Sequence, residues 1–144
     1  MNGQETITLD DYYEYVMEKG LLLTKDHAKR WSNGVLKTLG TALDRRTKKA
    51  LAKALPEELG ESLTSVFWLA HFRDPNQSTV EFCSRVARRS GNSNGEFALH
   101  PTIAVFSGVR SLIDNDLDER VSKSLSPQLS ELWGQANYEL LTVQ

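Results

Sequence analysis

The sequence predicts an all-α protein, an eight-helix bundle built from two tandem four-helix repeats. Three observations support this prediction. The chain repeats its pattern of apolar and helix-capping residues 70 positions apart. Apolar residues recur at helical spacing along most of its length. No segment shows the sustained alternation of β-branched residues that is typical of strands. Each copy would carry apolar stripes that the other copy can bury.

Length and composition indicate an ordinary globular protein. The chain has 144 residues, of which 40% are hydrophobic and 25% charged, and its formal net charge of -2 gives no overall attraction to nucleic acid or anionic lipid. The N-terminus lacks the basic and apolar regions of a signal peptide, and no apolar run approaches the roughly 20 residues that span a bilayer. Cys83 is the only cysteine, which excludes an intramolecular disulfide. We therefore expect a cytoplasmic protein that does not enter the membrane.

The repeat predicts the domain organisation. Residues 1–7 carry little that could be buried, and we expect them to form a flexible tail. Residues 8–144 would form a single helical domain, with repeat one at 8–74 and repeat two at 78–144. Proline and turn-forming residues at 73–77 indicate the linker between the repeats.

The first helix of each repeat has a start signal and a stop signal. Residues 8–11 read Thr-x-x-Asp and residues 78–81 read Ser-x-x-Glu, which indicate capping boxes. Gly20 and Gly91 follow at the far ends, and we expect each to adopt the left-handed conformation that commonly closes a helix.

The second helices should differ between the repeats. Thr24 and Asn94 are good N-cap residues, and an apolar stripe follows each of them. The second repeat has Pro101 at the position of Trp31. Because proline removes a backbone donor and clashes with the preceding turn, we expect this helix to restart or kink at His100-Pro101.

The third helices are short. Asp44 caps the first of them, and Asp114 or Asp116 caps the second. We expect the two helices to end near Leu55 and Leu125.

The fourth helices begin with proline near the first turn. Residues 56–72 are apolar on nearly all sides, which predicts a helix at the centre of the molecule, between the repeats. The corresponding segment 127–143 carries an amphipathic stripe from Leu129 to Val143.

The chain resembles a bacterial family known as domain of unknown function 2267. The similar segments are Leu9-Asp10-Asp11-Tyr12 through Gly20, Val35-Leu36-Lys37-Thr38-Leu39, residues 50–59 with their Leu-Pro-Glu-Glu-Leu element, residues 82–91, and residues 125–133. The resemblance covers roughly residues 9–133. It implies a helical domain with an internal duplication, and it brings no activity and no catalytic residues. The chain departs from the family pattern at Pro101 and at Ser126-Pro127.

Charge is the strongest functional signal. Residues 25–53 contain nine basic and two acidic residues, whereas residues 95–123 contain three basic and five acidic ones. The candidate partner-binding or anion-binding residues are Arg45, Arg46, Lys48, Lys49 and Lys53. This basic segment could bind phosphates, or face the acidic segment of the other repeat or of a second subunit, or act only as a solvated surface. Nucleic acid is the least favoured partner, because no aromatic residues are interleaved with the basic ones.

Other residues carry no recognisable chemistry. His27, His71 and His100 lack the spacing of a metal site, and Cys83 beside Phe82 resembles a buried thiol. The acidic run at 114–119 lacks the glycine and the terminal glutamate of a calcium loop. Most aromatic residues should lie in the core, with Tyr15 and Tyr138 as candidate interface anchors. We expect no catalytic residues, metal or cofactor.

Three functional hypotheses remain open. The first is a non-enzymatic interaction or regulatory module, which binds a protein partner or a second copy through the basic surface or through a groove beside the central helix. The second is phosphate or nucleic-acid binding by the same surface. The third is a small-ligand protein with a pocket between the repeats.

Overall fold

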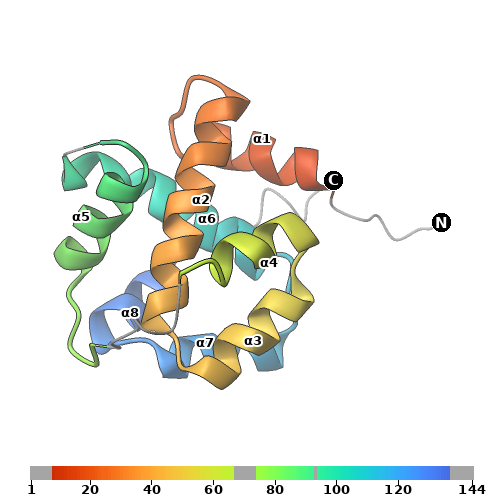
Figure 1. Cartoon of the computed structure of the whole chain (residues 1–144), viewed down its shortest axis with the longest axis vertical. Coiled ribbons are helices and arrows are strands. Elements are labelled where there is room, and N and C mark those ends of the chain that lie inside the picture. Colours follow the sequence, from red (N-terminus) through yellow and green to blue (C-terminus); the bar gives the residue numbers. More distant parts are fainter. Residues whose placement is uncertain (1–7, 67–73, 93, 137–144) are drawn as a thin grey trace.

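A computed structural model describes residues 8–66, 74–92 and 94–136, and the regular secondary structure in this part of the chain is all helical (Figure 1). The predicted all-α class and the eight α-helices are confirmed, and a short 3₁₀ helix, η2, is added to them. The predicted tail at 1–7 lies outside the described residues. The helices are α1 (Leu9–Lys19), α2 (Lys25–Ala42), α3 (Arg45–Ala54), α4 (Glu57–Leu63), α5 (Thr79–Arg89), η2 (Gly95–Ala98), α6 (Leu99–Arg110), α7 (Asn115–Ser124) and α8 (Pro127–Gln135).

The predicted capping boxes open α1 and α5. The Thr8 hydroxyl accepts a hydrogen bond from the Asp11 N–H at 3.0 Å, and the Asp11 carboxylate accepts one from the Thr8 N–H at 3.3 Å. Ser78 and Glu81 form the same pair at the start of α5. These bonds satisfy backbone donors that a helix start leaves unpaired, so the local sequence determines where each helix begins.

Side chains also cap most of the other helices, and the caps keep the 70-residue spacing. Thr24 and Asn94 cap α2 and η2, and Asp44 and Asp114 cap α3 and α7, as predicted. Both short third helices end at the predicted leucines. The offset of 70 is therefore present in the helix boundaries, whereas a common origin of the two halves stays a prediction.

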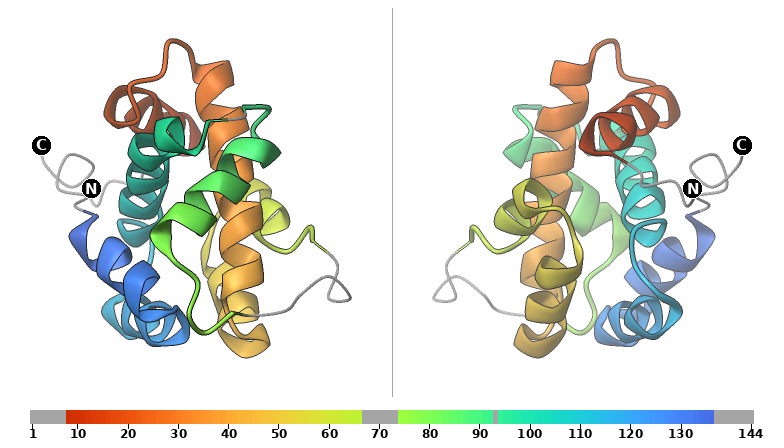
Figure 2. Two further views of the ribbon diagram at one scale, coloured as in Figure 1. Left: turned by 90° about the vertical axis from the view of Figure 1, so that its left-hand side faces the viewer. Right: turned by 90° about the vertical axis from the view of Figure 1, so that its right-hand side faces the viewer.

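The two halves of the chain are interlocked. Helix α1 packs on α6, α5 packs on α2, and α3 packs on α7, so every one of these pairs joins the first half to the second. Helix α2 runs through the centre of the molecule and contacts α1, α4, α5 and α6 (Figures 1 and 2). The core consequently includes side chains from both halves: one buried cluster contains Tyr12, Leu36 and Leu39 of the first half together with Phe82, Phe106 and Trp133 of the second.

Pro101 makes the second helical segment of the second half differ from α2 of the first half, as predicted. Helix α2 is continuous over 18 residues, but the equivalent segment is divided into η2 and α6. The α-helix restarts at Leu99, which places Pro101 in its first turn, where a missing N–H costs no helical hydrogen bond.

The prediction of a central helix at 56–72 is wrong in length and in place. Helix α4 ends at Leu63, residues 64–66 are not helical, and residues 67–72 lie outside the described part. Helix α4 packs mainly on α2 and α3, and α2 takes the central position instead. The amphipathic stripe at the C-terminus is likewise helical only to Gln135, with Ala136 as the cap and residues 137–144 undescribed.

The two closing glycines behave differently. Gly91 has φ +82°, as predicted, whereas Gly20 has φ -83° and the left-handed residue is Leu21, with φ +60°. Gly20 is needed for another reason: a Cβ there would lie 3.3 Å from the Cα of Pro101 and 2.6 Å from the Val16 carbonyl oxygen. The glycine therefore allows the end of α1 to approach α6 closely.

Replacing Gly91 with alanine should lower the free energy of unfolding by about 1 kcal/mol, because an L residue is strained in the left-handed region. The surroundings are open, with nothing within 4 Å of an added Cβ, so backbone strain is the main effect. Urea unfolding followed by circular dichroism measures it. An unchanged midpoint would contradict this account.

Candidate functional site

Helix α3 presents most of the predicted basic residues on one exposed face. At about 100° per residue, Arg45, Lys49 and Lys53 follow one another along the helix, and Arg46 lies beside them. All four are exposed, and we call them the α3 basic face. Lys48, the fifth predicted residue, is only partly exposed.

The opposite side of α3 holds the helix on the molecule. Thr47 and Leu51 are buried, and both the Thr47 N–H and its hydroxyl donate to the Asp44 carboxylate at 2.8 and 3.0 Å. The Asp44 N–H donates to the Ser124 hydroxyl at 2.8 Å, which ties the start of α3 to the end of α7. The basic face is therefore a fixed surface of the fold.

This arrangement of charge lowers helix stability. Two arginines occupy the first turn of α3, which contains no acidic residue, although the positive end of the helix dipole disfavours cations there. The spacing of Arg45, Lys49 and Lys53 places like charges four residues apart, which costs about 0.2–0.5 kcal/mol per pair. Arg46, Lys49 and Lys53 form no ion pair within the described part of the chain.

Lys48 has a different environment from the α3 basic face. Its aliphatic stem lies against α2, because a Cβ added at Gly40 would be 3.4 Å from Lys48 Cδ. Burial, followed by repulsion from Arg45, lowers the pKa of the Lys48 ammonium group. The predicted five-residue site thus divides into four outward-facing cations and one that packs toward the centre.

The acidic segment of the second half is largely occupied elsewhere. Asp114 caps its own helix, and Asp118 forms an ion pair with Arg110 at 2.9 Å. Asp116 and Glu119 are exposed. Helix α3 packs on α7, so the two oppositely charged segments are neighbours. The carboxylates of Asp114 and Asp118, however, bind groups within the second half.

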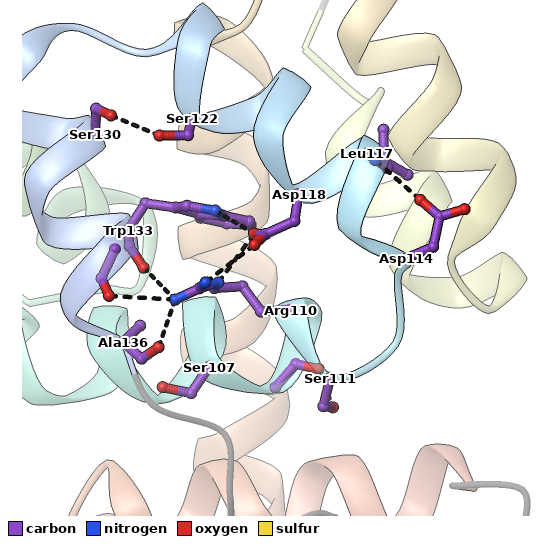
Figure 3. Close-up of polar contacts among 12 residues, drawn as sticks. Ser107, Arg110, Ser111, Asp114, Leu117, Asp118, Ser122, Ser130, Trp133 and Ala136 are labelled. Atoms are coloured by element: carbon purple, nitrogen blue, oxygen red, sulfur yellow. Dashed lines mark hydrogen bonds and ion pairs between the residues drawn. The ribbon is translucent and has the colours of Figure 1, made fainter.

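Arg110, Asp118 and Trp133 form a polar cluster that joins α6, α7 and α8 (Figure 3). The Arg110 guanidinium donates to both carboxylate oxygens of Asp118 at 2.9 Å, and the Trp133 indole N–H donates to the same carboxylate at 2.7 Å. Arg110 Nη1 also donates to the carbonyl oxygens of Trp133 and Ala136 at 2.9 and 2.8 Å, at the end of α8.

This cluster is structural and does not form a ligand site. The guanidinium donors already have acceptors in the protein, and the carbonyls they satisfy are those that a helix end leaves unpaired. The residues of the cluster come from three helices and no short motif relates them, so the cluster cannot be predicted from the sequence. The bidentate pairing of Arg110 is evident only once the helices are packed.

A largely apolar hollow of about 320 Å³ lies between α5 and the η2–α6 junction. It is inside the second half, so it is not the predicted pocket between the repeats. Cys83 lines it but is 4% exposed, and burial raises the pKa of its thiol, which agrees with the predicted unreactive cysteine. No convergent set of polar groups favours a particular ligand. The lining residues are Thr79, Val80, Cys83, Ser84, Asn94, Gly95, Glu96 and Leu99.

The aromatic residues do not form the alternative recognition surface. Tyr15 is 5% exposed, so it lacks the exposure that would make it an interface anchor, and Tyr138 lies outside the described residues. Tyr12 is fully buried and its hydroxyl pairs with Ser32 at 2.7 Å, while Tyr13 donates to Glu58 at 2.9 Å. Burial is the main cause that raises the pKa of both phenols.

In residues 8–66, 74–92 and 94–136, no three His, Cys, Asp or Glu side chains are grouped so as to hold a metal ion. None of the helices in these ranges combines the length and apolar character that a bilayer crossing requires. His71 and Trp68 lie outside them.

Comparison with known proteins identifies a family but no activity. Residues 9–132 match the family described as "Uncharacterized conserved protein (DUF2267)". A search of curated proteins finds no match to the chain. The matched range extends from the start of α1 into α8, so it includes the α3 basic face, Arg110 and Asp118, and it ends one residue before Trp133.

Proposed function

This chain belongs to the DUF2267 family of uncharacterized conserved proteins, and since that membership carries no activity, we propose a function from its surface: a non-enzymatic, cytoplasmic interaction module that binds an acidic protein partner through the α3 basic face. The observation that carries the proposal is the row of Arg46, Lys49 and Lys53, which are exposed and form no ion pair within the described residues. The helix retains these charges at a cost to its own stability.

An acidic protein surface fits this face better than nucleic acid does. Helix α4 packs beside α3 and carries the exposed carboxylates of Glu57, Glu58 and Glu61. A duplex lying across α3 would bring its phosphates close to these carboxylates, which is unfavourable. A protein partner can place acidic residues opposite α3 and avoid them opposite α4.

The first test uses a defined acidic helix as the probe. A synthetic helical peptide with glutamates at positions i, i+4 and i+8 should bind the wild-type chain, and R46E/K49E/K53E should weaken binding at least about tenfold, because attraction becomes repulsion. Isothermal titration calorimetry at 50 mM salt measures the difference. The same peptide binding both proteins equally would contradict the proposal.

A matched control separates the face from the net charge. Lys19, Arg120 and Lys123 are also exposed, on α1 and α7. K19E/R120E/K123E has the same net charge as the α3 variant and should retain the affinity of the wild type. Titration of duplex DNA and single-stranded RNA at 50 and 200 mM salt tests the alternative: tight binding that falls steeply with salt would replace the proposal with nucleic-acid binding.

A further inference from the structure

We propose that the protein partner of the α3 basic face includes a second copy of this chain, and that the two copies associate through a bipolar surface formed by α3 and α4. This inference rests on the proposed function and assigns the partner. The α3–α4 surface consists of a basic row, Arg46, Lys49 and Lys53, and an acidic row, Glu57 and Glu61. All five side chains are exposed.

A close helix crossing brings the two rows side by side. Helix α4 follows α3 after only Leu55 and Pro56, and the two helices pack on each other. A Cβ added at Gly60 would lie 2.7 Å from the carbonyl oxygen of Ala52, so the backbones approach as closely as glycine allows. Glu57 and Glu61 are one turn apart on the outer side of α4.

The charges in the two rows are not neutralised by each other. Within the described residues, none of the five side chains takes part in an ion pair or a side-chain hydrogen bond. Glu58 is different, since its carboxylate accepts the hydrogen bond from Tyr13. A positive row and a negative row therefore face solvent together on adjacent helices.

Such a surface is complementary to itself under two-fold symmetry. The two-fold axis lies between the two rows and runs along them, parallel to the surface. Under this symmetry the basic row of each copy lies opposite the acidic row of the other. The same contact is made twice, so the interface is closed and ends at a dimer. A uniformly acidic ligand could match only the basic row, whereas a second copy matches both.

The space between the rows permits close approach. Ala52, the α3 residue at the crossing with Gly60, is half-buried and carries only a methyl side chain. Because the attraction comes from exposed charges, we expect association to depend steeply on salt and to require higher concentrations than an apolar interface would.

The test is sedimentation velocity of the full chain over a range of concentrations, at 50 mM and 500 mM sodium chloride. The wild type should show a reversible monomer–dimer equilibrium at 50 mM, with a dissociation constant raised at least about tenfold at 500 mM. R46E/K49E/K53E makes both rows acidic, and E57K/E61K makes both rows basic. Each variant should be monomeric alone, and an equimolar mixture of the two should restore the dimer.

The restored dimer also shows that both variants are folded, since unfolded chains could not reconstitute the contact. A mixture that stays monomeric, or an α3 variant that still dimerises alone, would overturn the inference. A wild type that is monomeric at 50 mM salt would overturn it too. In that case binding of the acidic peptide still decides the proposed function, because the peptide requires only the basic row.

Discussion

The Trp133→Ala variant is expected to lose about 4 kcal/mol of unfolding free energy, because truncating a buried aromatic side chain leaves a cavity that the surroundings fill only in part. Trp133 is 1% exposed, and its ring lies 5.1 Å from that of Phe106. The substitution also removes the indole N–H that donates to Asp118. Urea unfolding monitored by far-ultraviolet circular dichroism measures the loss.

Two further variants separate packing from polar contact. Trp133→Phe keeps an aromatic ring beside Phe106 but removes the donor, and it should cost about 1–2 kcal/mol for the lost bond to a carboxylate together with the smaller ring. Lys25→Ala removes the exposed ion pair with Asp10, and we expect no measurable change. A phenylalanine variant as unstable as the alanine variant would show that the hydrogen bond, rather than ring packing, dominates.

Replacing Gly40 with alanine should destabilise the protein by about 2 kcal/mol, even though alanine is favoured over glycine within a helix by about 1 kcal/mol. Gly40 lies inside α2, and an added Cβ would overlap the carbonyl oxygen of Leu63 at the end of α4. Since the overlapped atom is backbone, one of the two helices must move. Thermal and urea unfolding both report the effect.

Gly134 provides the matched control for this substitution. It lies in α8, and nothing is within 4 Å of an added Cβ. Gly134→Ala should therefore leave stability unchanged or raise it by up to about 1 kcal/mol. If both variants shifted stability in the same direction by the same amount, helix propensity and not close packing would be the cause.

Helix starts were predictable because their determinants are local. Thr8, Ser78, Asp44 and Asp114 each accept a hydrogen bond from a backbone N–H three residues later, so a window of four residues contains the signal. The effect of Pro101 was predictable for the same reason. The 70-residue spacing strengthened these predictions, because each signal occurred twice.

Features that depend on packing were not predictable. The segment 56–72 has an apolar composition, but its helix ends at Leu63, and composition alone does not determine where a helix ends. Leu21 adopts the left-handed conformation in place of Gly20, and Gly20 instead lies at the close contact with Pro101. The cluster of Arg110 and Asp118 required knowledge of three packed helices.

The candidate site was predicted in part. The run of basic charge was sufficient to select Arg45, Arg46, Lys49 and Lys53, all of which are exposed. It did not place Lys48 against α2. The acidic row on α4 was missed, because its position beside the basic row results from the close crossing at Gly60 and not from any sequence pattern.

The interlocked halves have a consequence for folding during synthesis on the ribosome. Tyr12 of α1 lies against α6, where a Cβ added at Gly108 would be 2.7 Å from Tyr12 Cε1. A nascent chain that has reached only the first half lacks this surface, and α2 lacks α5. We therefore expect the tertiary structure to become fully stable only after α6 has emerged from the exit tunnel.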